Sequence, residues 1–360
     1  MATNSNELAQ PKYKHLLIIR TSALGDVAML PHAVRAFKEA YPKVKVSILT
    51  KQFLRPLFDG LDVNFIFLDD KKRKIGEFAN LWRVAGEIKR AGVDAIADVH
   101  GVHRSSILRI LCFMRGFIPS HAIDKGRIEK WFRMGYSRAT AVPLKHSVIR
   151  YCDVIRSFGF EFDDPKPAQR QRFENPMGVK SGRWIGFAPF SAHEGKTYPE
   201  GMREELVDLL AERFDEVFIH SGGGEEAAFA EAMEKKHENV TALWRRLPFN
   251  EERDLISNLD CVITMDSLVM HLAALVATPT VSVWGATHPE LGFTGYGSDC
   301  RGILQEEMPC RPCSVYGKKP CKTGDYKCIK AITPQRIIER VEEIIALTNT
   351  DEAKDEPKAE

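Results

Sequence analysis

Short apolar runs alternate with longer helical stretches along this chain, and this alternation constrains the fold more than any other feature. The run His15–Arg20 is apolar on both faces, which suits a strand buried inside a parallel sheet. A helix is expected from about Val27 to Tyr41, with Pro31 near its first turn, where proline is tolerated. Because another apolar run, Val44–Leu49, follows directly, the spacing predicts right-handed βαβ units.

The alternation of strands and helices is interrupted once along the chain. The segment from Phe162 to Gly182 is rich in proline and charge, a composition typical of a linker. Before it we expect further strands at 65–68 and 95–99 and a helix at 75–91. After it we expect strands at 183–188, 217–220, 261–264 and 280–284, and helices at 202–214, 227–234, 251–259 and 268–276.

The length of 360 residues exceeds what one hydrophobic core usually supports, so two domains are expected. We assign Rossmann-like, doubly wound α/β domains to residues 12–165 and 180–332. A final helix at 333–348 and a disordered tail at 349–360 complete the expected organisation. Ligands of open α/β sheets bind at the carboxyl ends of the strands, so a cleft between the two sheets is the expected active site.

The apolar segments do not predict a membrane span. The first ten residues are polar and lack the features of a signal peptide. The longest apolar region, Cys261–Gly285, is interrupted by Asp266, His271 and Pro279, which a bilayer-spanning helix rarely carries together. We therefore expect a cytosolic chain.

Basic residues concentrate in one part of the chain. Residues 71–150 hold 17 Lys/Arg against 6 Asp/Glu, although the whole chain has a formal net charge of only +2. Such a block indicates a surface that meets phosphates of a lipid, a nucleic acid or a small molecule. A solvated helical face is the alternative.

The turn after the first strand contains Gly25 and Asp26. Gly25 permits a tight strand-to-helix turn, and Asp26 is expected at or near the amino end of the helix. An aspartate there is favoured as a helix cap on local grounds. It is equally suited to accept a proton from an acceptor hydroxyl, and one carboxylate can do both.

Two loops of the second half suit a nucleotide. Ser191 and Lys196 follow the first strand of that half and offer a hydroxyl and a positive charge to a pyrophosphate, although a loop lysine alone is usually only solvated. The glycines at 222–224 suggest a close approach to the backbone, for example by a ribose whose hydroxyls bind Glu225 or Glu226. Capping of the next helix is the competing interpretation of these glutamates.

Another strand ends in Asp266 and Ser267, which begin a helix. The amino end of a helix carries partial positive charge and free N–H groups, so it suits a diphosphate. His271 in that helix is more often a packed side chain than a catalytic one. The next strand leads into a loop through Gly285 and Thr287 toward the same cleft.

Taken in order, these motifs resemble glycosyltransferase family 9, the bacterial heptosyltransferases, over about residues 14–345. The resemblance implies a GT-B fold and inverting transfer of heptose from ADP-heptose to the lipopolysaccharide inner core, an acceptor of the lipid A–Kdo type. It implies partners of three kinds: a nucleotide sugar, an anionic lipid-linked glycan and, peripherally, the inner membrane. Nucleic acid is not among them.

The family's functional residues transfer to this chain by position. Asp26 matches the general base. The residues that match donor contacts are Ser191, Lys196, Glu225 (or Glu226), Asp266, Ser267, His271 and Thr287. The residues in the acceptor region are Ser22, His100, His103 and Arg104. No metal or other cofactor is implied, because Lys196 and a helix dipole can stabilise the leaving diphosphate.

Two positions depart from the family pattern. Leu268 stands where a small residue or glycine is common, and Tyr198 where tryptophan is usual. These departures leave open transfer of another nucleotide sugar to a different envelope glycan. A non-catalytic GT-B protein that binds sugar nucleotides is the alternative from another functional class.

Eight cysteines divide into two groups. Cys112, Cys152 and Cys261 lie in apolar contexts and are expected in the core. A late segment holds the other five, Cys300, Cys310, Cys313, Cys321 and Cys328, of which Cys310 and Cys313 form a C-x2-C pair. This group is compatible with a structural metal, with a disulfide or with free thiols.

Overall fold

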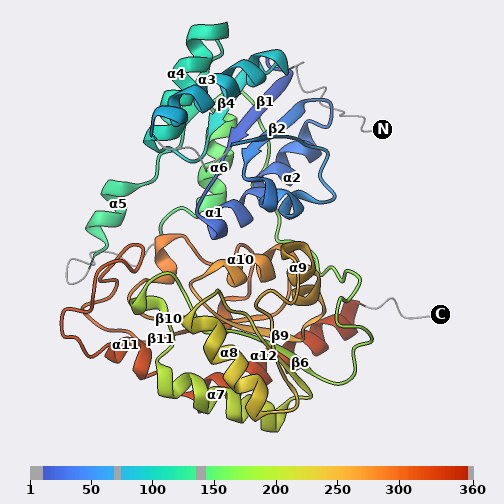
Figure 1. Ribbon diagram of the computed structural model, residues 1–360, viewed down its shortest axis with the longest axis vertical. Coiled ribbons are helices and arrows are strands. Elements are labelled where there is room, and N and C mark those ends of the chain that lie inside the picture. The colour runs from blue at the N-terminus through green and yellow to red at the C-terminus, as the bar shows by residue number, and fades with distance from the viewer. Residues whose placement is uncertain (1–10, 69–73, 135–142, 356–360) are drawn as a thin grey trace, which may run out of the picture. The chain divides into compact units, whose positions relative to one another are not determined.

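The computed structural model describes residues 11–68, 74–134 and 143–355, and it divides into two compact units (Figure 1). The first unit comprises Met1–Lys125 and Ser147–Pro165, and the second comprises Gly126–His146 and Lys166–Glu360. Residues 126–146 therefore group with the second unit, whereas the sequence placed them in the first range. The reason is a tertiary contact: Nε2 of His146 lies 2.8 Å from the carbonyl oxygen of Thr294 in the second unit.

The first unit is built on a five-stranded parallel sheet in the order β3-β2-β1-β4-β5. The central strand β1 pairs with β2 on one side and β4 on the other, so the strand order reverses between β1 and β4. The strands span His15–Ile19 (β1), Lys45–Thr50 (β2), Asn64–Phe67 (β3), Ala95–Asp98 (β4) and Ser120–Ala122 (β5). All but the three-residue β5 were expected from the sequence.

Helices cover both faces of this sheet. Helices α3 (Lys74–Arg90) and α4 (His103–Gly116) lie side by side, and their apolar side chains share a core with Leu17 and Ile19 of β1 (Figure 1). Successive side chains of a strand point to opposite faces, so Leu16 and Ile18 face the other layer. That layer contains α2 (Leu30–Ala40) and α6 (Ser147–Arg156), which pack against each other. A short helix, α1 (Leu24–Ala28), precedes α2, and a 3-10 turn, η1, follows β2 at Gln52–Phe58.

The second unit contains a six-stranded parallel sheet in the order β11-β10-β9-β6-β7-β8. Counted along the chain, this is the 3-2-1-4-5-6 order of a doubly wound fold, and it reverses between β6 and β9. The strands span Trp184–Ala188 (β6), Glu216–Ile219 (β7), Val240–Ala242 (β8), Cys261–Met265 (β9), Thr280–Trp284 (β10) and Ile303–Gln305 (β11). The short edge strands β8 and β11 were not expected.

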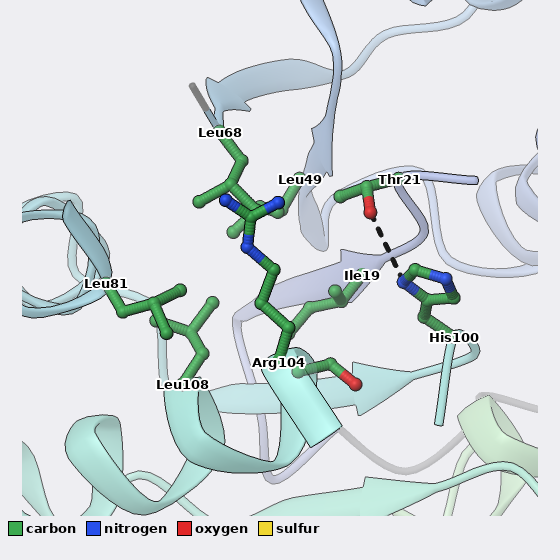
Figure 2. Close-up of a pocket in the computed structure, with 9 residues that line it drawn as sticks. Ile19, Thr21, Leu49, Leu68, Leu81, His100, Arg104 and Leu108 are labelled. Carbon is green, nitrogen blue, oxygen red and sulfur yellow. Dashed lines mark hydrogen bonds between the residues drawn. The ribbon is translucent and has the colours of Figure 1, made fainter. Parts of the chain in front are cut away.

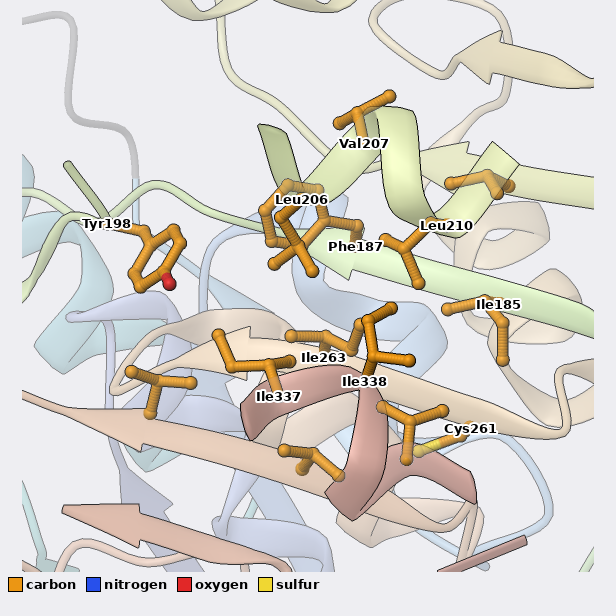
Figure 3. Packing of buried hydrophobic residues seen from close by; sticks show 14 of the residues in the cluster. Ile185, Phe187, Tyr198, Leu206, Val207, Leu210, Cys261, Ile263, Ile337 and Ile338 are labelled. Atoms are coloured by element: carbon orange, nitrogen blue, oxygen red, sulfur yellow. The ribbon is translucent and has the colours of Figure 1, made fainter. Parts of the chain in front are cut away.

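The core of the second unit is shown in Figure 3. Ile185, Phe187 and Ile263 of the sheet pack against Leu206 and Leu210 of α7 and against α12. Complete burial of each such side chain stabilises the fold by about 1.5–3 kcal/mol. The helices of this unit are α5 (Arg127–Phe132), α7 (Glu200–Arg213), α8 (Glu225–Lys236), α9 (Phe249–Asn258), α10 (Leu268–Leu275), α11 (Lys327–Lys330) and α12 (Pro334–Asp355).

Helix α12 corrects the expectation of a disordered tail from residue 349. The helix continues to Asp355, while residues 356–360 lie outside the described residues. The hydroxyls of Thr348 and Thr350 donate to the carbonyls of Ile344 and Ala346, so these two polar residues bond within the helix instead of interrupting it.

Across the described part of the chain, no helix combines the length and the apolar character needed to span a bilayer.

Candidate active site

The loop after β1 carries Asp26 as the third residue of α1. The helix thus begins at Leu24, earlier than the sequence indicated, because the Asp26 carboxylate accepts a hydrogen bond from the backbone N–H of Ala23 at 3.2 Å. The same carboxylate forms an ion pair with Arg20. The capping role is therefore present, and the side chain remains partly open to solvent, at 28% exposure.

Arg20 and Tyr151 contact the turn that carries Asp26. The buried guanidinium of Arg20 donates to the carbonyl oxygen of Val99 at 2.5 Å and lies 5.6 Å from the centre of the Tyr151 ring. The Tyr151 hydroxyl donates in turn to the backbone carbonyl of Asp26 at 3.2 Å. Two buried side chains thereby restrict the position of the Asp26 carboxylate and of the helix that bears it.

His100 follows β4 and meets the same loop. Its Nδ1 lies 3.3 Å from the Thr21 hydroxyl and its Nε2 lies 3.1 Å from the Ser22 hydroxyl (Figure 2 shows the first contact). Burial, reinforced by the nearby Arg20 charge, lowers the pKa of His100 to about 4. The ring is therefore neutral near pH 7, with one nitrogen as donor and the other as acceptor.

Asp98 is a site residue that the sequence analysis missed. This fully buried carboxylate at the end of β4 accepts from the backbone N–H groups of His100 and Gly101, at 3.1 and 2.8 Å. Its other oxygen lies 3.1 Å from Nε of Arg109. An acidic residue that ends an otherwise apolar strand was the available signal.

A small pocket in this unit brings part of the predicted acceptor set together (Figure 2). His100 and Arg104 border it, and Ser22 reaches it only through its contact with His100. Arg104 Nε lies 3.0 Å from the Glu77 carboxylate, whereas His103, the first residue of α4, is exposed. The pocket lining comprises Ile19, Thr21, Leu49, Leu68, Leu81, His100, Arg104, Ser105 and Leu108.

In the second unit, Asp266 is the centre of a network that joins three loops. Oδ2 of its carboxylate lies 3.1 Å from Nζ of Lys196 and accepts a hydrogen bond from the Thr287 hydroxyl at 2.9 Å. Its backbone carbonyl accepts from the Ser191 hydroxyl at 3.2 Å. Four of the predicted donor residues thus meet, although they are up to 96 positions apart between Ser191 and Thr287.

Ser191 follows β6 and Asp266 follows β9, so this network flanks the point where the strand order reverses. In doubly wound sheets that reversal opens a crevice at the carboxyl ends of the strands, where ligands bind. In the first unit the Asp26 turn and His100 flank the corresponding reversal between β1 and β4. Each unit therefore presents part of its predicted residues at the switch point of its own sheet.

The remaining predicted donor residues lie around this network or apart from it. Ser267 precedes the first residue of α10, and its hydroxyl lies 3.2 Å from that of Thr264. His271 is buried in α10 and interacts with His146, as a packed side chain would. Glu225 is exposed at the start of α8, and among the described residues no hydrogen bond or ion pair joins it to Asp266.

The glycine loop before α8 is shaped by the protein's own side chains. The backbone N–H of Gly222 donates to the Glu226 carboxylate at 2.7 Å. A Cβ added at Gly223 would lie 2.9 Å from the Trp244 ring. Glu226 and Trp244 therefore account for the close approach inferred from Gly222 and Gly223.

Arg311 is the second residue that sequence reasoning missed. It is almost completely buried, and its guanidinium donates to the carbonyls of Gly285 at 2.5 Å and Thr287 at 2.9 Å. It also bonds the carbonyls of Trp284 and Glu306. Arg311 thus fixes the loop that presents the Thr287 hydroxyl to Asp266. Its place between two cysteines of the C-x2-C pair was the only sequence signal.

The cysteine-rich segment packs against the Lys196 loop. The Tyr326 hydroxyl donates to Glu194 at 2.9 Å, and the backbone N–H of Cys313 donates to Ala286 at 3.1 Å. All eight cysteines are free thiols in the structure. Among the described residues, no three His, Cys, Asp or Glu side chains gather in a group that could hold a metal ion.

Two doubly wound parallel sheets in series, with polar networks at both switch points, define a GT-B fold. The chain belongs to glycosyltransferase family 9 (heptosyltransferase), whose sequence profile matches residues 81–323. This membership confirms the family resemblance and the enzyme class expected from the sequence.

Known relatives cover nearly the whole chain at low identity. Lipopolysaccharide heptosyltransferase 1 of Pseudomonas aeruginosa is 23% identical and is aligned over 93% of this chain and 99% of its own. A solved family 9 glycosyltransferase from Veillonella parvula superimposes with a TM-score of 0.71 at 19% identity, covering 93% of this chain and 97% of that one. The structure of the ADP-heptose lps heptosyltransferase II of E. coli gives 0.68 at 17% identity, covering 93% and 99%.

Proposed function

We propose that this protein transfers heptose from ADP-heptose to the lipopolysaccharide inner core. The network of Ser191, Lys196, Asp266 and Thr287 at the switch point of the second sheet carries the proposal. The names of the relatives support it, since the E. coli structure is that of an ADP-heptose lps heptosyltransferase and the P. aeruginosa relative is a lipopolysaccharide heptosyltransferase.

The second unit binds the nucleotide sugar in this proposal. Lys196 supplies positive charge to the diphosphate, and the amino end of α10 adds free N–H groups after Ser267. Both interactions strengthen as the bond to the leaving ADP breaks and negative charge accumulates on its phosphate. Thr287 and Asp266 orient the Lys196 ammonium. Glu225, exposed at the start of α8, takes part as a ribose contact.

The first unit binds the acceptor and supplies the base. An acceptor hydroxyl gives its proton to the Asp26 carboxylate while its oxygen attacks the anomeric carbon of the heptose. The bond from that carbon to the diphosphate breaks in the same displacement, so the configuration inverts and ADP leaves. Ser22, His100, His103 and Arg104 form the acceptor side, with an anionic lipid A–Kdo type acceptor reached at the inner face of the inner membrane.

The Asp26→Asn variant tests the base. The amide keeps the shape of the side chain but cannot accept the proton, so turnover with ADP-heptose and heptose-free lipopolysaccharide should fall at least 100-fold. ADP affinity measured by calorimetry should stay unchanged. Asp62→Asn is the matched control, because Asp62 is an exposed carboxylate of the same unit in an ion pair with Lys38. Turnover of Asp26→Asn at the control level would refute the assignment.

The donor sugar is a separate question. Tyr198 lies in the core, where its hydroxyl donates to the Ile332 carbonyl, so its difference from tryptophan concerns packing and not the sugar. The second departure from the family pattern, Leu268, is the first residue of α10 and lies beside Ser267. It supports transfer of another nucleotide sugar as the second candidate. Titration with ADP-, UDP- and GDP-sugars distinguishes the two, and donor binding without transfer to any acceptor would indicate a non-catalytic binding protein.

A further inference from the structure

Helix α4 carries large apolar side chains on its solvent side as well as on its buried side. Leu108, Leu111 and Cys112 face the core of the first unit. The solvent side carries five large apolar side chains at helical spacing: Ile107, Ile110, Phe113, Met114 and Phe117. Met114 is 66% exposed and Phe117, just past the end of the helix, is 78% exposed. A surface helix normally presents polar residues on this side.

The neighbouring helix α3 extends the same apolar surface. Phe78 and Trp82 are exposed and stacked, with ring centres 6.4 Å apart. The guanidinium of Arg115 on α4 lies 4.3 Å from the centre of the Trp82 ring, which joins the two helices. We call the seven residues Phe78, Trp82, Ile107, Ile110, Phe113, Met114 and Phe117 the outer apolar face. Large apolar side chains exposed on two neighbouring helices indicate an interaction site.

Positive charge accompanies this face. Helices α3 and α4 together hold seven Lys/Arg and two Glu. The charge concentrates where both helices end, because Lys89 and Arg90 are exposed there and the Lys89 ammonium donates to the Arg115 carbonyl at 2.5 Å. That end also carries Phe117, the most exposed side chain of the face.

We propose that the outer apolar face binds the surface of an anionic phospholipid bilayer. Large apolar side chains enter the boundary between headgroups and acyl chains, and neighbouring Lys and Arg attract anionic headgroups while their stems remain apolar. An apolar protein partner would match the side chains of α4 but not the rim of Lys89, Arg90 and Arg115, which calls for negative charge around an apolar centre. A bilayer with anionic lipids offers both.

The inference deepens the proposed function, on which its purpose rests: it gives the means by which the enzyme meets a lipid-linked acceptor. The apolar stripe of α4 begins beside His103, four residues before Ile107, and the pocket residues His100 and Arg104 lie next to it in the chain. Docking by this face would therefore hold the acceptor side of the first unit close to the lipid.

The test measures partition of the whole protein into vesicles that contain neither donor nor acceptor. Wild-type protein should sediment with vesicles of phosphatidylcholine and phosphatidylglycerol. The triple variant Ile110→Ser/Met114→Ser/Phe117→Ser should partition at least tenfold less. Phe117→Ser alone should lower partition about threefold, whereas Val179→Ser, at a 95% exposed position of the other unit, should not change it.

Charge is tested separately with Arg90→Glu. Because each basic residue near an anionic surface contributes about a factor of five to binding, reversal of this charge should lower partition into phosphatidylglycerol vesicles at least fivefold. Partition into pure phosphatidylcholine vesicles should not change. Thermal melting by circular dichroism checks that every variant is folded, as expected for substitutions at exposed positions.

Wild-type protein that stays in solution with anionic vesicles, or a folded triple variant that partitions as wild type does, would overturn the proposal. A wild-type dimer that the triple variant dissociates, with no binding to vesicles, would instead identify the face as a contact between copies of this chain. Failure of the proposed transfer is seen separately, with acceptor dispersed in detergent, where the triple variant should turn over as fast as wild type.

Discussion

The Lys196 ammonium and the Asp266 carboxylate lie 3.1 Å apart, with both side chains largely buried. Asp266 holds the lysine in position, and the Thr287 hydroxyl holds Asp266. In the absence of ligand the carboxylate neutralises the lysine. A bound diphosphate would share the same ammonium, so the balance between these two anions is expected to set donor affinity.

Lys196→Ala should therefore do more than remove one cation. It leaves Asp266 as an unpaired negative charge beside the diphosphate, so kcat/KM should fall about 100- to 1,000-fold and ADP affinity should fall with it. The double variant Lys196→Ala/Asp266→Asn should recover part of the lost ADP affinity, because the repulsion is gone. Calorimetry with ADP measures both.

The control for this pair is Lys236→Ala, which removes the lysine of an exposed ion pair with Asp208 in the same unit. Exposed pairs contribute about 0–1 kcal/mol to stability, and ADP binding should be unchanged. Equal ADP affinity in the Lys196 and Lys236 variants would show that Lys196 does not touch the diphosphate.

Arg311→Lys should destabilise the second unit and weaken ADP binding together. Lysine keeps the charge but loses the planar fork that bonds the carbonyls of Trp284, Gly285 and Thr287. Buried carbonyls left without donors cost about 1–3 kcal/mol each, so a loss of roughly 2–4 kcal/mol is expected in urea denaturation. Arg301→Lys, at an exposed arginine nearby, should change stability by less than about 0.5 kcal/mol. Similar losses in both variants would contradict this account.

His146 should make stability depend on pH. Burial, with a smaller contribution from His271, lowers its pKa to about 4 from 6.5. Between these values the unfolded chain binds the proton and the folded chain does not, so stability falls as pH falls from about 6.5 to about 4. His146→Gln keeps an N–H for the Thr294 carbonyl and should flatten this decline by roughly 2–3 kcal/mol at pH 4. Urea denaturation at several pH values measures it, and parallel curves would exclude the effect.

The sequence predicted most of the longer elements of both units because their apolar runs are long enough to show a period, but it did not predict α4 and α6 of the first unit. The strands β5, β8 and β11 were not predicted. Each is three residues long and lies at a sheet edge, where pairing is decided by the neighbouring strand. The grouping of residues 126–146 with the second unit also depends on contacts made more than 140 positions away, such as that of His146 with Thr294.

Some residues of the candidate site could likewise be predicted from the sequence, and others could not. Ser191, Asp266 and Thr287 follow strands, and residues at the carboxyl ends of neighbouring parallel strands meet by the rules of the fold. Arg311 could not be foreseen in this way, because its partners are backbone carbonyls of a loop 24 to 27 positions away. Every residue has a backbone carbonyl, so the sequence does not indicate which carbonyls accept hydrogen bonds from a side chain. Only the tertiary structure reveals which ones a buried guanidinium will bond.

Gly317→Ala should disturb Lys196 from a distance in the chain. Gly317 has φ of +78°, and a Cβ there would lie 2.7 Å from Cγ and 2.8 Å from Cδ of Lys196. The lysine stem would have to move, which carries its ammonium away from Asp266. We expect ADP affinity to fall about tenfold, equivalent to 1.4 kcal/mol.

Gly324→Ala provides the matched control, because Gly324 lies in the same segment, has φ of +72° and has no atom within 4 Å of an added Cβ. Both variants carry the same backbone strain of about 1 kcal/mol, so both should melt at similar temperatures. Only Gly317→Ala should lose ADP affinity. If the two bind ADP equally well, the position of the Lys196 stem does not govern donor binding, and the cysteine-rich segment has no part in shaping that site.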